Sequence, residues 1–242
     1  MPTPVKIPAI VESVVQHTNS VKSFIMKPIK PCPNFRPGQS LHFAIDEYDP
    51  SFHWPESRVF SIVNSPTRRN NLKITFSVKG TFTNRMFNEV RSGDRVWLKL
   101  PYGSFTFPED NREFVFIAGG TGITPYISFL EYAIDKKLSN KIMLYYGIRS
   151  PEHVIFNSML HECQIRLDQF RLQLFVEGVS KIKGFDKACK GKLPILEILN
   201  NTKITINTLF YLSGPLEMIQ TFNNVMMEKN ISEEKIRVDE WE

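Results

Sequence analysis

The pattern of hydrophobic residues changes once along the chain, close to residue 108. Before that point the apolar segments are short, rich in β-branched and aromatic residues, and separated by proline, glycine and asparagine. After it, continuous apolar runs alternate with segments of helical periodicity. The first pattern is typical of antiparallel strands, and the second of parallel strands joined by helices. The sequence therefore predicts two domains, 1–108 and 109–242.

The first half carries several segments with the composition of strands. They are 6–16, 40–46, 58–63, 72–79 and 94–100. Their spacing predicts an antiparallel Greek-key β-barrel. We also expect a short helix near residues 84–90, with Thr83 as its N-cap residue.

The second half alternates strands with helices. A strand at 113–118 precedes a helix in which Ile127, Leu130, Ile134 and Leu138 fall on one face. Further strands are expected at 141–147, 170–178, 207–214 and 235–241, and further helices at 150–163, 193–201 and 215–230. This order predicts a doubly wound parallel α/β domain, which binds nucleotides at the carboxyl ends of its strands.

Composition limits the class of protein. With 42% hydrophobic residues, a chain of 242 residues can form a substantial core. No apolar run approaches the roughly 20 residues of a membrane helix and no secretory signal is visible, so we expect no membrane span and a cytoplasmic protein. The three cysteines are widely spaced, which favours neither disulfides nor a metal site. The formal charge of +5 is spread along the chain, so we expect no nucleic-acid partner, while an acidic protein partner is compatible with it.

The stretch GGTGITP, residues 119–125, lies between the first strand and the first helix of the second half. Glycines there would let anionic oxygens approach backbone amides at the positive end of a helix. We expect Thr124 to cap that helix and Pro125 to occupy its first turn. Because Pro125 replaces the third glycine of the dinucleotide fingerprint, an ordinary tight turn is an alternative. The lysine of a phosphate-binding P-loop is absent, which argues against an ATPase or GTPase.

Three other motifs occur in a fixed order around this stretch. RVFS (58–61) ends a barrel strand, SVKGTFTNRM (77–86) follows another, and YLSGP (211–215) ends a strand of the second half. With these motifs, nearly the whole chain resembles the ferredoxin–NADP(+) reductase family. The resemblance implies FAD on the barrel domain, NAD(P)H on the following domain, and hydride transfer from the nicotinamide to the flavin.

On the barrel, the resemblance assigns residues to FAD. Arg58 would bind a phosphate, and Ser61 would lie beside the reactive N5 edge of the flavin. Phe60 stands where tyrosine is commoner, so a stacking surface would remain without the phenolic hydrogen bond. The other candidates flank the flavin or form the turn at its pyrophosphate, and they are Val59, Val78, Lys79, Gly80, Phe82 and Thr83.

In the second domain, the resemblance assigns residues to NAD(P)H. The candidates in the glycine-containing turn are Gly119, Gly120, Thr121, Gly122 and Pro125. Those at later strand ends are Gly147, Arg149, Ser180, Lys181, Gly214 and Pro215. Lys181 or Lys183 would pair with the additional phosphate of NADPH, which slightly favours NADPH, although a lysine-rich loop is also typical of plain solvated surface.

Four residues are expected closest to the reacting atoms, namely Ser61, Ser213, Asp239 and Trp241. Ser213 stands where many members of the family have cysteine near the nicotinamide, so only a hydroxyl is available. Trp241 would cover the flavin until the nicotinamide displaces it, with Asp239 at the carboxylate spacing. The alternative is a tryptophan that finishes a strand and packs on the sheet.

The resemblance thus implies a monomeric FAD-dependent NAD(P)H reductase. The cysteine pattern of a fused [2Fe–2S] domain is absent, so we expect a separate acceptor such as a ferredoxin, a flavodoxin or another redox protein. Basic residues such as Arg68, Arg69, Lys136 and Lys137 could steer an acidic carrier. Two alternatives stay open: an NAD(P)H:flavin reductase that uses free flavin as substrate, and a non-enzymatic docking subunit that retains the fold.

Overall fold

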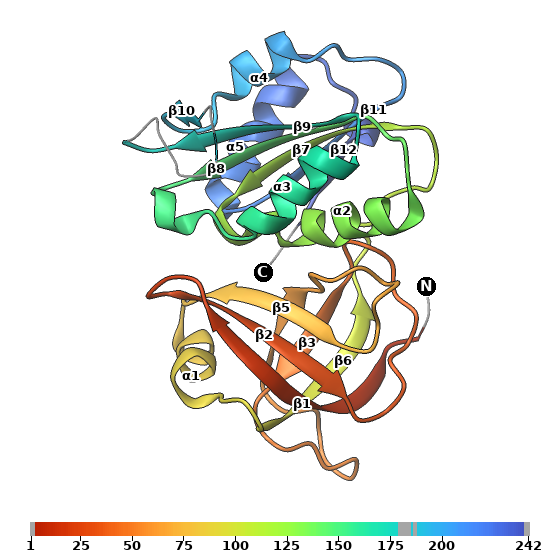
Figure 1. Cartoon of the computed structure of the whole chain (residues 1–242), viewed down its shortest axis with the longest axis vertical. Helices are drawn as coiled ribbons and strands as arrows, with labels where there is room; N and C mark the ends of the chain where they lie inside the picture. The colour runs from red at the N-terminus through yellow and green to blue at the C-terminus, as the bar shows by residue number, and fades with distance from the viewer. Residues whose placement is uncertain (1–2, 179–184, 186–187, 240–242) are drawn as a thin grey trace. The chain divides into compact units, whose positions relative to one another are not determined.

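The computed structural model describes residues 3–178, 185 and 188–239, and the chain forms two compact units (Figure 1). The first unit comprises residues 1–107 and 124–132, and the second comprises residues 108–123 and 133–242. A boundary between residues 108 and 109 stays a prediction. Residues 124–132, which follow that boundary in sequence, group with the first unit.

The first unit is an antiparallel six-stranded sheet with the order β4-β3-β6-β1-β2-β5. Strands β4 and β5 at its two edges lie side by side, so the sheet nearly closes into the predicted barrel. In chain order its elements are β1 (Val5–Gln16), β2 (Val21–Pro28), β3 (Ser40–Ala44), β4 (Ser57–Ser61), β5 (Leu72–Ser77), α1 (Thr81–Glu89) and β6 (Arg95–Tyr102). The sequence analysis missed β2, because the buried Ser23 interrupts its apolar pattern; the Ser23 hydroxyl lies 2.6 Å from that of Thr75.

Alternate residues of the barrel strands face its interior. In β6, the buried side chains Val96, Leu98 and Leu100 alternate with more exposed ones. At the centre, the Phe24 ring lies 5.7 Å from that of Phe43, between ring centroids. Burial of a side chain of this size stabilises the fold by about 1.5–3 kcal/mol. The barrel core is therefore the main support for the residues at its surface.

The second unit contains a parallel sheet with the order β10-β9-β8-β7-β11-β12, which confirms the predicted doubly wound architecture. Its strands are β7 (Glu113–Gly119), β8 (Ile142–Ile148), β9 (Phe170–Val176), β10 (Ala188–Lys190), β11 (Thr208–Ser213) and β12 (Ile236–Val238). The chain starts in the centre at β7, moves outward through β8 and β9, and returns to β11 on the other side. The edge between β7 and β11 is therefore the topological switch point, where doubly wound sheets bind ligands.

Helices cover both faces of this sheet, so its strands are apolar throughout. In β7, Val115 and Ile117 belong to the apolar cluster that α4 and α5 complete, whereas Phe114 and Phe116 face the other side. Figure 1 shows α3 on the side of the sheet opposite α5. The helices are α2 (Thr124–Lys136), α3 (Asn157–Arg166), α4 (Ile195–Asn201) and α5 (Leu216–Glu228), with 3₁₀ turns η1 (Gly120–Ile123), η2 (Pro151–His153) and η3 (Glu233–Lys235).

The ends of α2 differ from the sequence prediction. Thr124 does not cap this helix, because η1 already forms a helical turn before it and Thr124 is the first α-helical residue. At the other end Lys137 has a left-handed φ of 56°, and its amide donates to carbonyls of the last turn. Leu138 therefore lies beyond the helix. Left-handed caps of this kind are a common way to satisfy terminal carbonyls.

Three further observations concern the described part of the chain. None of its helices combines the length and the apolar sequence needed to cross a membrane. It contains no cluster of three or more histidine, cysteine, aspartate and glutamate side chains arranged to hold a metal ion. Cys32, Cys163 and Cys189 are free thiols.

Candidate functional site

Strand β4 carries Arg58 on the barrel surface, next to the start of α1. Its side chain is 50% exposed, and Nη2 lies 2.8 Å from Oε1 of Glu56. The guanidinium carbon lies 5.0 Å from the centroid of the Phe82 ring, and Phe82 is a buried residue of α1. The structure thus brings together two of the sequence-predicted residues, Arg58 and Phe82.

Helix α1 begins at Thr81, three residues before the expected start, with Gly80 as its N-cap. Thr83 is therefore not the cap. As the third helical residue it accepts hydrogen bonds through Oγ1 from the amides of Lys79 (2.8 Å) and Gly80 (3.0 Å). The first intrahelical bond runs from the amide of Asn84 to the carbonyl of Gly80, so the amides of Thr81, Phe82 and Thr83 have no acceptor within the helix and can face an anion.

A hollow of about 530 Å³ opens beside this helix start. Its lining residues are Val78, Lys79, Gly80, Thr81, Asn84 and Arg85. Arg85 is held by Asp46, since Nη1 and Nη2 donate to the two carboxylate oxygens at 3.2 and 2.8 Å, and these bonds lower the pKa of Asp46. The sequence analysis named the first three lining residues and missed the others. The spacing of Thr81 and Arg85, which places them on one helix face, is the signal that could have found them.

Phe60 and Ser61 follow Arg58 in β4. The Phe60 ring lies 6.4 Å from that of Phe43 and 6.0 Å from that of Phe76, between centroids, and it packs against the barrel core. Contacts with the core therefore reduce the stacking surface expected of Phe60. Ser61 is buried, with 6% exposure, and Val59 is half-buried.

In the second unit, the turns after β7 and β11 pack against each other. A β carbon at Gly122 would lie 2.4 Å from the carbonyl oxygen of Ser213, and one at Gly214 would lie 3.0 Å from the amide nitrogen of Gly119. A β carbon at Gly119 would lie 2.8 Å from Cδ of Pro215. Gly122 and Gly214 are thus explained by close backbone approach, and Gly119 by the room that the Pro215 side chain takes. Pro215 is the N-cap of α5, one residue before the helix that it was expected to start.

Gly120 differs from the neighbouring glycines. Its φ of 55° is left-handed, and a β carbon there would meet nothing within 4 Å. It opens the 3₁₀ turn η1, so the glycine segment is helical rather than an open loop. Of the glycines expected to let an anion approach the backbone, Gly120 is therefore the one that faces open space. Thr121 is half-buried, and Pro125 lies in the first turn of α2, as predicted.

Ser213 and Asp239 meet although they are 26 residues apart. Ser213 Oγ donates to Oδ2 of Asp239 at 2.8 Å, and both residues are buried. Asp239 directly follows β12, and its amide donates to the carbonyl of Leu212 at 2.9 Å. Because a buried carboxylate requires hydrogen-bond donors, the Ser213 proton is directed to Asp239.

The end of β8 carries two further candidates. Gly147 pairs with Gly119 in the sheet, so both lie at the same edge. A β carbon at Gly147 would lie 2.7 Å from Cγ of Leu193, so glycine makes room for that side chain. Arg149 is exposed just beyond the strand.

Four candidates, Ser180, Lys181, Lys183 and Trp241, lie outside the described residues. Their assigned roles stay predictions.

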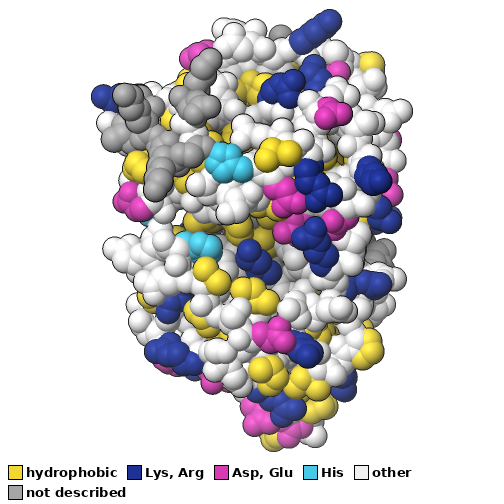
Figure 2. All heavy atoms as spheres, viewed as in Figure 1, with side chains coloured by type: hydrophobic (Ala, Val, Ile, Leu, Met, Phe, Trp, Pro, Cys, Tyr) yellow, Lys and Arg dark blue, Asp and Glu magenta, His cyan; other side chains and the backbone are white. Residues whose placement is uncertain are grey.

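The basic residues expected to steer a carrier have neighbours of their own. Arg68 Nη1 lies 3.9 Å from Oε2 of Glu131, and Arg69 donates to Asn34. On the face shown in Figure 2, basic and acidic side chains are interspersed. This face therefore presents no continuous basic stripe.

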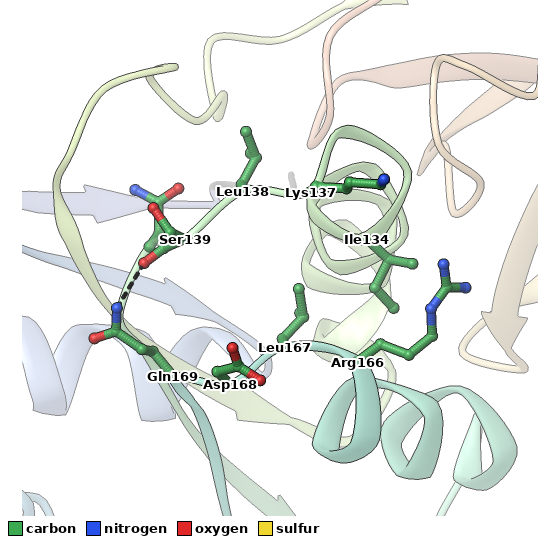
Figure 3. A pocket seen from close by; sticks show the side chains of 9 residues that line it. Ile134, Lys137, Leu138, Ser139, Arg166, Leu167, Asp168 and Gln169 are labelled. Carbon is green, nitrogen blue, oxygen red and sulfur yellow. Dashed lines mark hydrogen bonds between the residues drawn. The ribbon is translucent and has the colours of Figure 1, made fainter.

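A second hollow, of about 420 Å³, lies at the amino ends of β8 and β9 (Figure 3). Lys137 and Arg166 reach it from the carboxyl ends of α2 and α3, where cations complement the helix dipole. Arg166 also pairs with Glu162 at 2.7 Å, and Gln169 donates to the Ser139 carbonyl at 3.0 Å. Because this is the sheet end opposite the switch point, we assign it no part in nucleotide binding.

Each unit thus has one place that suits a phosphate group. In the barrel it combines the half-exposed Arg58, the first amides of α1, and Gly80, where a β carbon would meet nothing within 4 Å. In the second unit it is the start of η1 at Gly120, which likewise faces open space. Both sites place backbone amides at a helix start without a covering side chain, so their donors fit the phosphates of a dinucleotide.

Comparison with known proteins identifies relatives of the chain. Residues 116–224 match the family model described as the oxidoreductase NAD-binding domain. Oxidoreductase NdmD of Pseudomonas putida is 31% identical over 93% of this chain, which covers 35% of that protein. The reductase component of propane 2-monooxygenase from Mycolicibacterium smegmatis is 27% identical over 86% of this chain, which covers 60% of it. The chain therefore spans about a third to three fifths of the length of these curated relatives.

Solved structures share the fold. A ferredoxin NADP+ reductase from Neisseria gonorrhoeae, with bound FAD and NADP, aligns with a TM-score of 0.78 and 19% identity over 99% of both chains. The Amycolatopsis cytochrome P450 reductase GcoB aligns with a TM-score of 0.82 and 20% identity, over 98% of this chain and 70% of the other. At these identities the likeness establishes the fold, a barrel followed by a doubly wound sheet.

Proposed function

We propose that this chain is an FAD-dependent NAD(P)H reductase of the ferredoxin–NADP(+) reductase-like family. Its match to the oxidoreductase NAD-binding domain over residues 116–224 and its fold support the proposal. The observation that supports the proposal most directly is that each unit has a helix start that faces open space, because a β carbon at Gly80 or at Gly120 would meet nothing within 4 Å. The first lies at Gly80, close to where the guanidinium carbon of Arg58 is 5.0 Å from the centroid of the Phe82 ring. The second lies at Gly120. A reductase that passes electrons between two dinucleotides needs two such sites.

On the barrel, Arg58 and the amides of Thr81 and Phe82 would bind the pyrophosphate of FAD. A guanidinium donates two parallel hydrogen bonds to phosphate oxygens, and the helix start adds positive potential. Glu56, now 2.8 Å from Arg58, is itself 53% exposed and can turn to solvent when a phosphate replaces it. Ser61 would donate a hydrogen bond to the flavin edge.

In the second unit, the amides at Gly120 would bind the pyrophosphate of NAD(P)H. Ser213 directs its proton to Asp239, so its Oγ keeps lone pairs for an incoming donor. We therefore assign Ser213 the role of accepting a hydrogen bond from the carboxamide of the nicotinamide. Lys181 would select NADPH through its additional phosphate.

Bound FAD supplies a ring that takes up a hydride from NAD(P)H and releases electrons one at a time. The chain's own residues bind and orient the two cofactors and exclude water from them. None of them needs to act as a nucleophile.

For the electron acceptor we propose a ferredoxin, a flavodoxin or an oxygenase component. The support comes from relatives whose names include the reductase component of propane 2-monooxygenase. Stopped-flow reduction of a purified ferredoxin over a series of salt concentrations tests this. We expect rates that fall as salt rises, because an acidic carrier is steered by charge; negligible rates at every salt concentration would exclude ferredoxin.

Two absorption spectra test the proposed enzyme. We expect the purified protein to be yellow, with flavin near full occupancy, and to bleach when NAD(P)H is added without oxygen. A flavin-loaded protein that NAD(P)H does not bleach would contradict the proposal and favour the docking subunit.

A second candidate is an NAD(P)H:flavin reductase that releases its flavin. It is favoured by the engagement of Arg58 with Glu56 and by the contacts of Phe60 with the barrel core, because both weaken the hold on a flavin. A colourless protein that oxidises NAD(P)H only when free FMN or riboflavin is added would select this candidate.

A further inference from the structure

Two side chains of α2 bind the backbone of the segment that follows β4. Ser128 Oγ donates to the carbonyl of Asn64 at 2.9 Å, and the amide of Ser65 donates to Oε2 of Glu131 at 2.9 Å. Ser128 and Ser65 are fully buried, and the Glu131 side chain is 14% exposed. Both contacts lie within the first compact unit. They join segments that are more than sixty residues apart in sequence.

The segment at Asn64 is itself held rigidly. The Asn64 side-chain amide donates to the carbonyls of Arg68 at 2.9 Å and Asn71 at 3.0 Å. Its carbonyl oxygen accepts from the amide of Lys73 at 2.8 Å. A buried amide with its donors and acceptor satisfied gives the loop one defined conformation.

Glu131 also faces two cations. Arg68 Nη1 lies 3.9 Å from its carboxylate. Burial lowers the pKa of Lys73, and the charge of Glu131 partly opposes that effect. An ionised Glu131 therefore strengthens the hydrogen bond from Ser65, since bonds to charged acceptors are the stronger ones.

The residues in these contacts are close in sequence to the candidate site residues. Residues 62–65 directly follow Ser61, and α2 directly follows η1 with Gly120. The contact grouping divides α2 itself, because residues 124–132 belong to the first unit and residues 133–136 to the second. One helix thus connects the segment after Ser61 to the turn that begins at Gly120.

We propose that Ser128 and Glu131 are positioning residues for hydride transfer. They bind the segment that follows Ser61 to the first part of α2, within the first unit, so that the flavin-facing hydroxyl of Ser61 keeps one position. This inference rests on the proposed function. A shift of Ser61 would matter because it would misplace the flavin, and hydride transfer depends steeply on the distance between donor and acceptor atoms.

The test compares the parent protein with three variants. Ser128→Ala combined with Glu131→Ala removes both bonds, and Glu131→Gln keeps an acceptor while removing the charge. Glu162→Ala is the control, because Glu162 is a carboxylate of α3 in an exposed pair with Arg166 at 2.7 Å.

Four quantities are measured in each protein. They are FAD occupancy after desalting, the melting temperature, the rate of flavin reduction at saturating NAD(P)H, and the long-wavelength absorbance of nicotinamide stacked on flavin. Amide hydrogen exchange at residues 62–66, without any nucleotide, reports the bonds directly.

For the double variant we expect FAD occupancy near that of the parent and a melting temperature lower by about 5 °C. Flavin reduction should be at least about tenfold slower, and the stacking absorbance weaker, because the rings are misaligned. Hydrogen exchange at Ser65 should be at least about tenfold faster. Glu131→Gln should recover most of the reduction rate, and the Glu162→Ala control should match the parent.

An equal reduction rate and equal stacking absorbance in parent and double variant would overturn the inference, whatever the melting temperature. A parent protein that NAD(P)H does not bleach would overturn the proposed function and this inference with it. If the double variant fails to fold, Ser128→Ala alone is measured in its place by the same two criteria.

Discussion

Glycine has different roles at the two proposed phosphate sites. In the barrel, Gly80 has an extended backbone, with φ of −166°, and a β carbon would meet nothing within 4 Å. In the second unit, Gly122 and Gly214 stand where two turns pack backbone against backbone, and a β carbon at Gly122 would lie 2.4 Å from a carbonyl oxygen. At the barrel site the glycine leaves open space and takes no part in the packing, whereas at the sheet site the glycines are part of the packing between two turns. Changes at the sheet site should therefore reduce stability as well as binding.

The largest effect is expected from Gly122→Ala. The added methyl group collides with the Ser213 carbonyl, so the two turns must separate at a cost of about 3 kcal/mol in the free energy of unfolding. NAD(P)H binding should be lost with it. Urea unfolding and nucleotide titration measure both.

Gly80→Ala is the matched control for that variant, because alanine fits an extended backbone in open space. We expect its stability within about 0.5 kcal/mol of the parent. If the two alanine variants prove equally stable, the contrast between the two sites is wrong.

Next in size is Ser213→Ala. It removes a buried hydrogen bond of 2.8 Å to the Asp239 carboxylate, which should lower stability by about 1–3 kcal/mol. The Michaelis constant for NAD(P)H should rise, since the acceptor for the carboxamide is also lost. Ser92→Ala, an exposed serine whose hydroxyl donates to the Glu12 carbonyl, serves as control. Unaltered nucleotide kinetics would remove Ser213 from the site.

Arg58→Ala should affect binding without affecting the fold. Its pair with Glu56 is exposed, so we expect a stability change below about 1 kcal/mol. The dissociation constant of FAD should rise about tenfold or more, because a charged hydrogen bond to phosphate is lost. Arg112→Ala, which breaks the exposed pair with Asp110, is the control. Equal FAD retention in both variants would refute the role of Arg58.

The smallest effect concerns pH. Burial, with a smaller contribution from a nearby lysine, lowers the pKa of both His17 and His42 below the ordinary 6.5. Their contribution to stability is complete above pH 6.5 and is lost as the pH falls from 6.5 through the lowered folded-state values, because the unfolded chain binds protons more readily. Urea unfolding, followed by the fluorescence of the barrel residues Trp54 and Trp97, should therefore begin at a lower urea concentration at about pH 5 than at about pH 7.5.

The combination of His17→Gln and His42→Gln should reduce that difference between the two pH values. An undiminished difference would assign the acid sensitivity to other groups.

Periodicity and motif order predict the class of each half, because both are local properties of the chain. Periodicity and motif order do not predict features that depend on a contact with a residue far away in the sequence. Ser23 can be buried in β2 because its hydroxyl has partners in the Thr75 hydroxyl, 2.6 Å away, and in Nε2 of His17, 2.7 Å away. The start of α1 at Thr81 is a different case, because the contacts there are local: the Thr83 hydroxyl accepts from the amides of Lys79 and Gly80 from inside the helix, so a threonine that looks like a cap is the third helical residue.

By itself the sequence determined the alternation of strands and helices, the positions of the glycines and the presence of Arg58 beside a barrel strand end. The tertiary structure alone decided which glycine faces open space, that Ser213 meets Asp239, and that Glu131 holds Ser65. Strand and helix formation depends on neighbours within a few residues. Contacts across 26 or 66 residues depend instead on how strands order and register in the folded sheet, which no local pattern encodes.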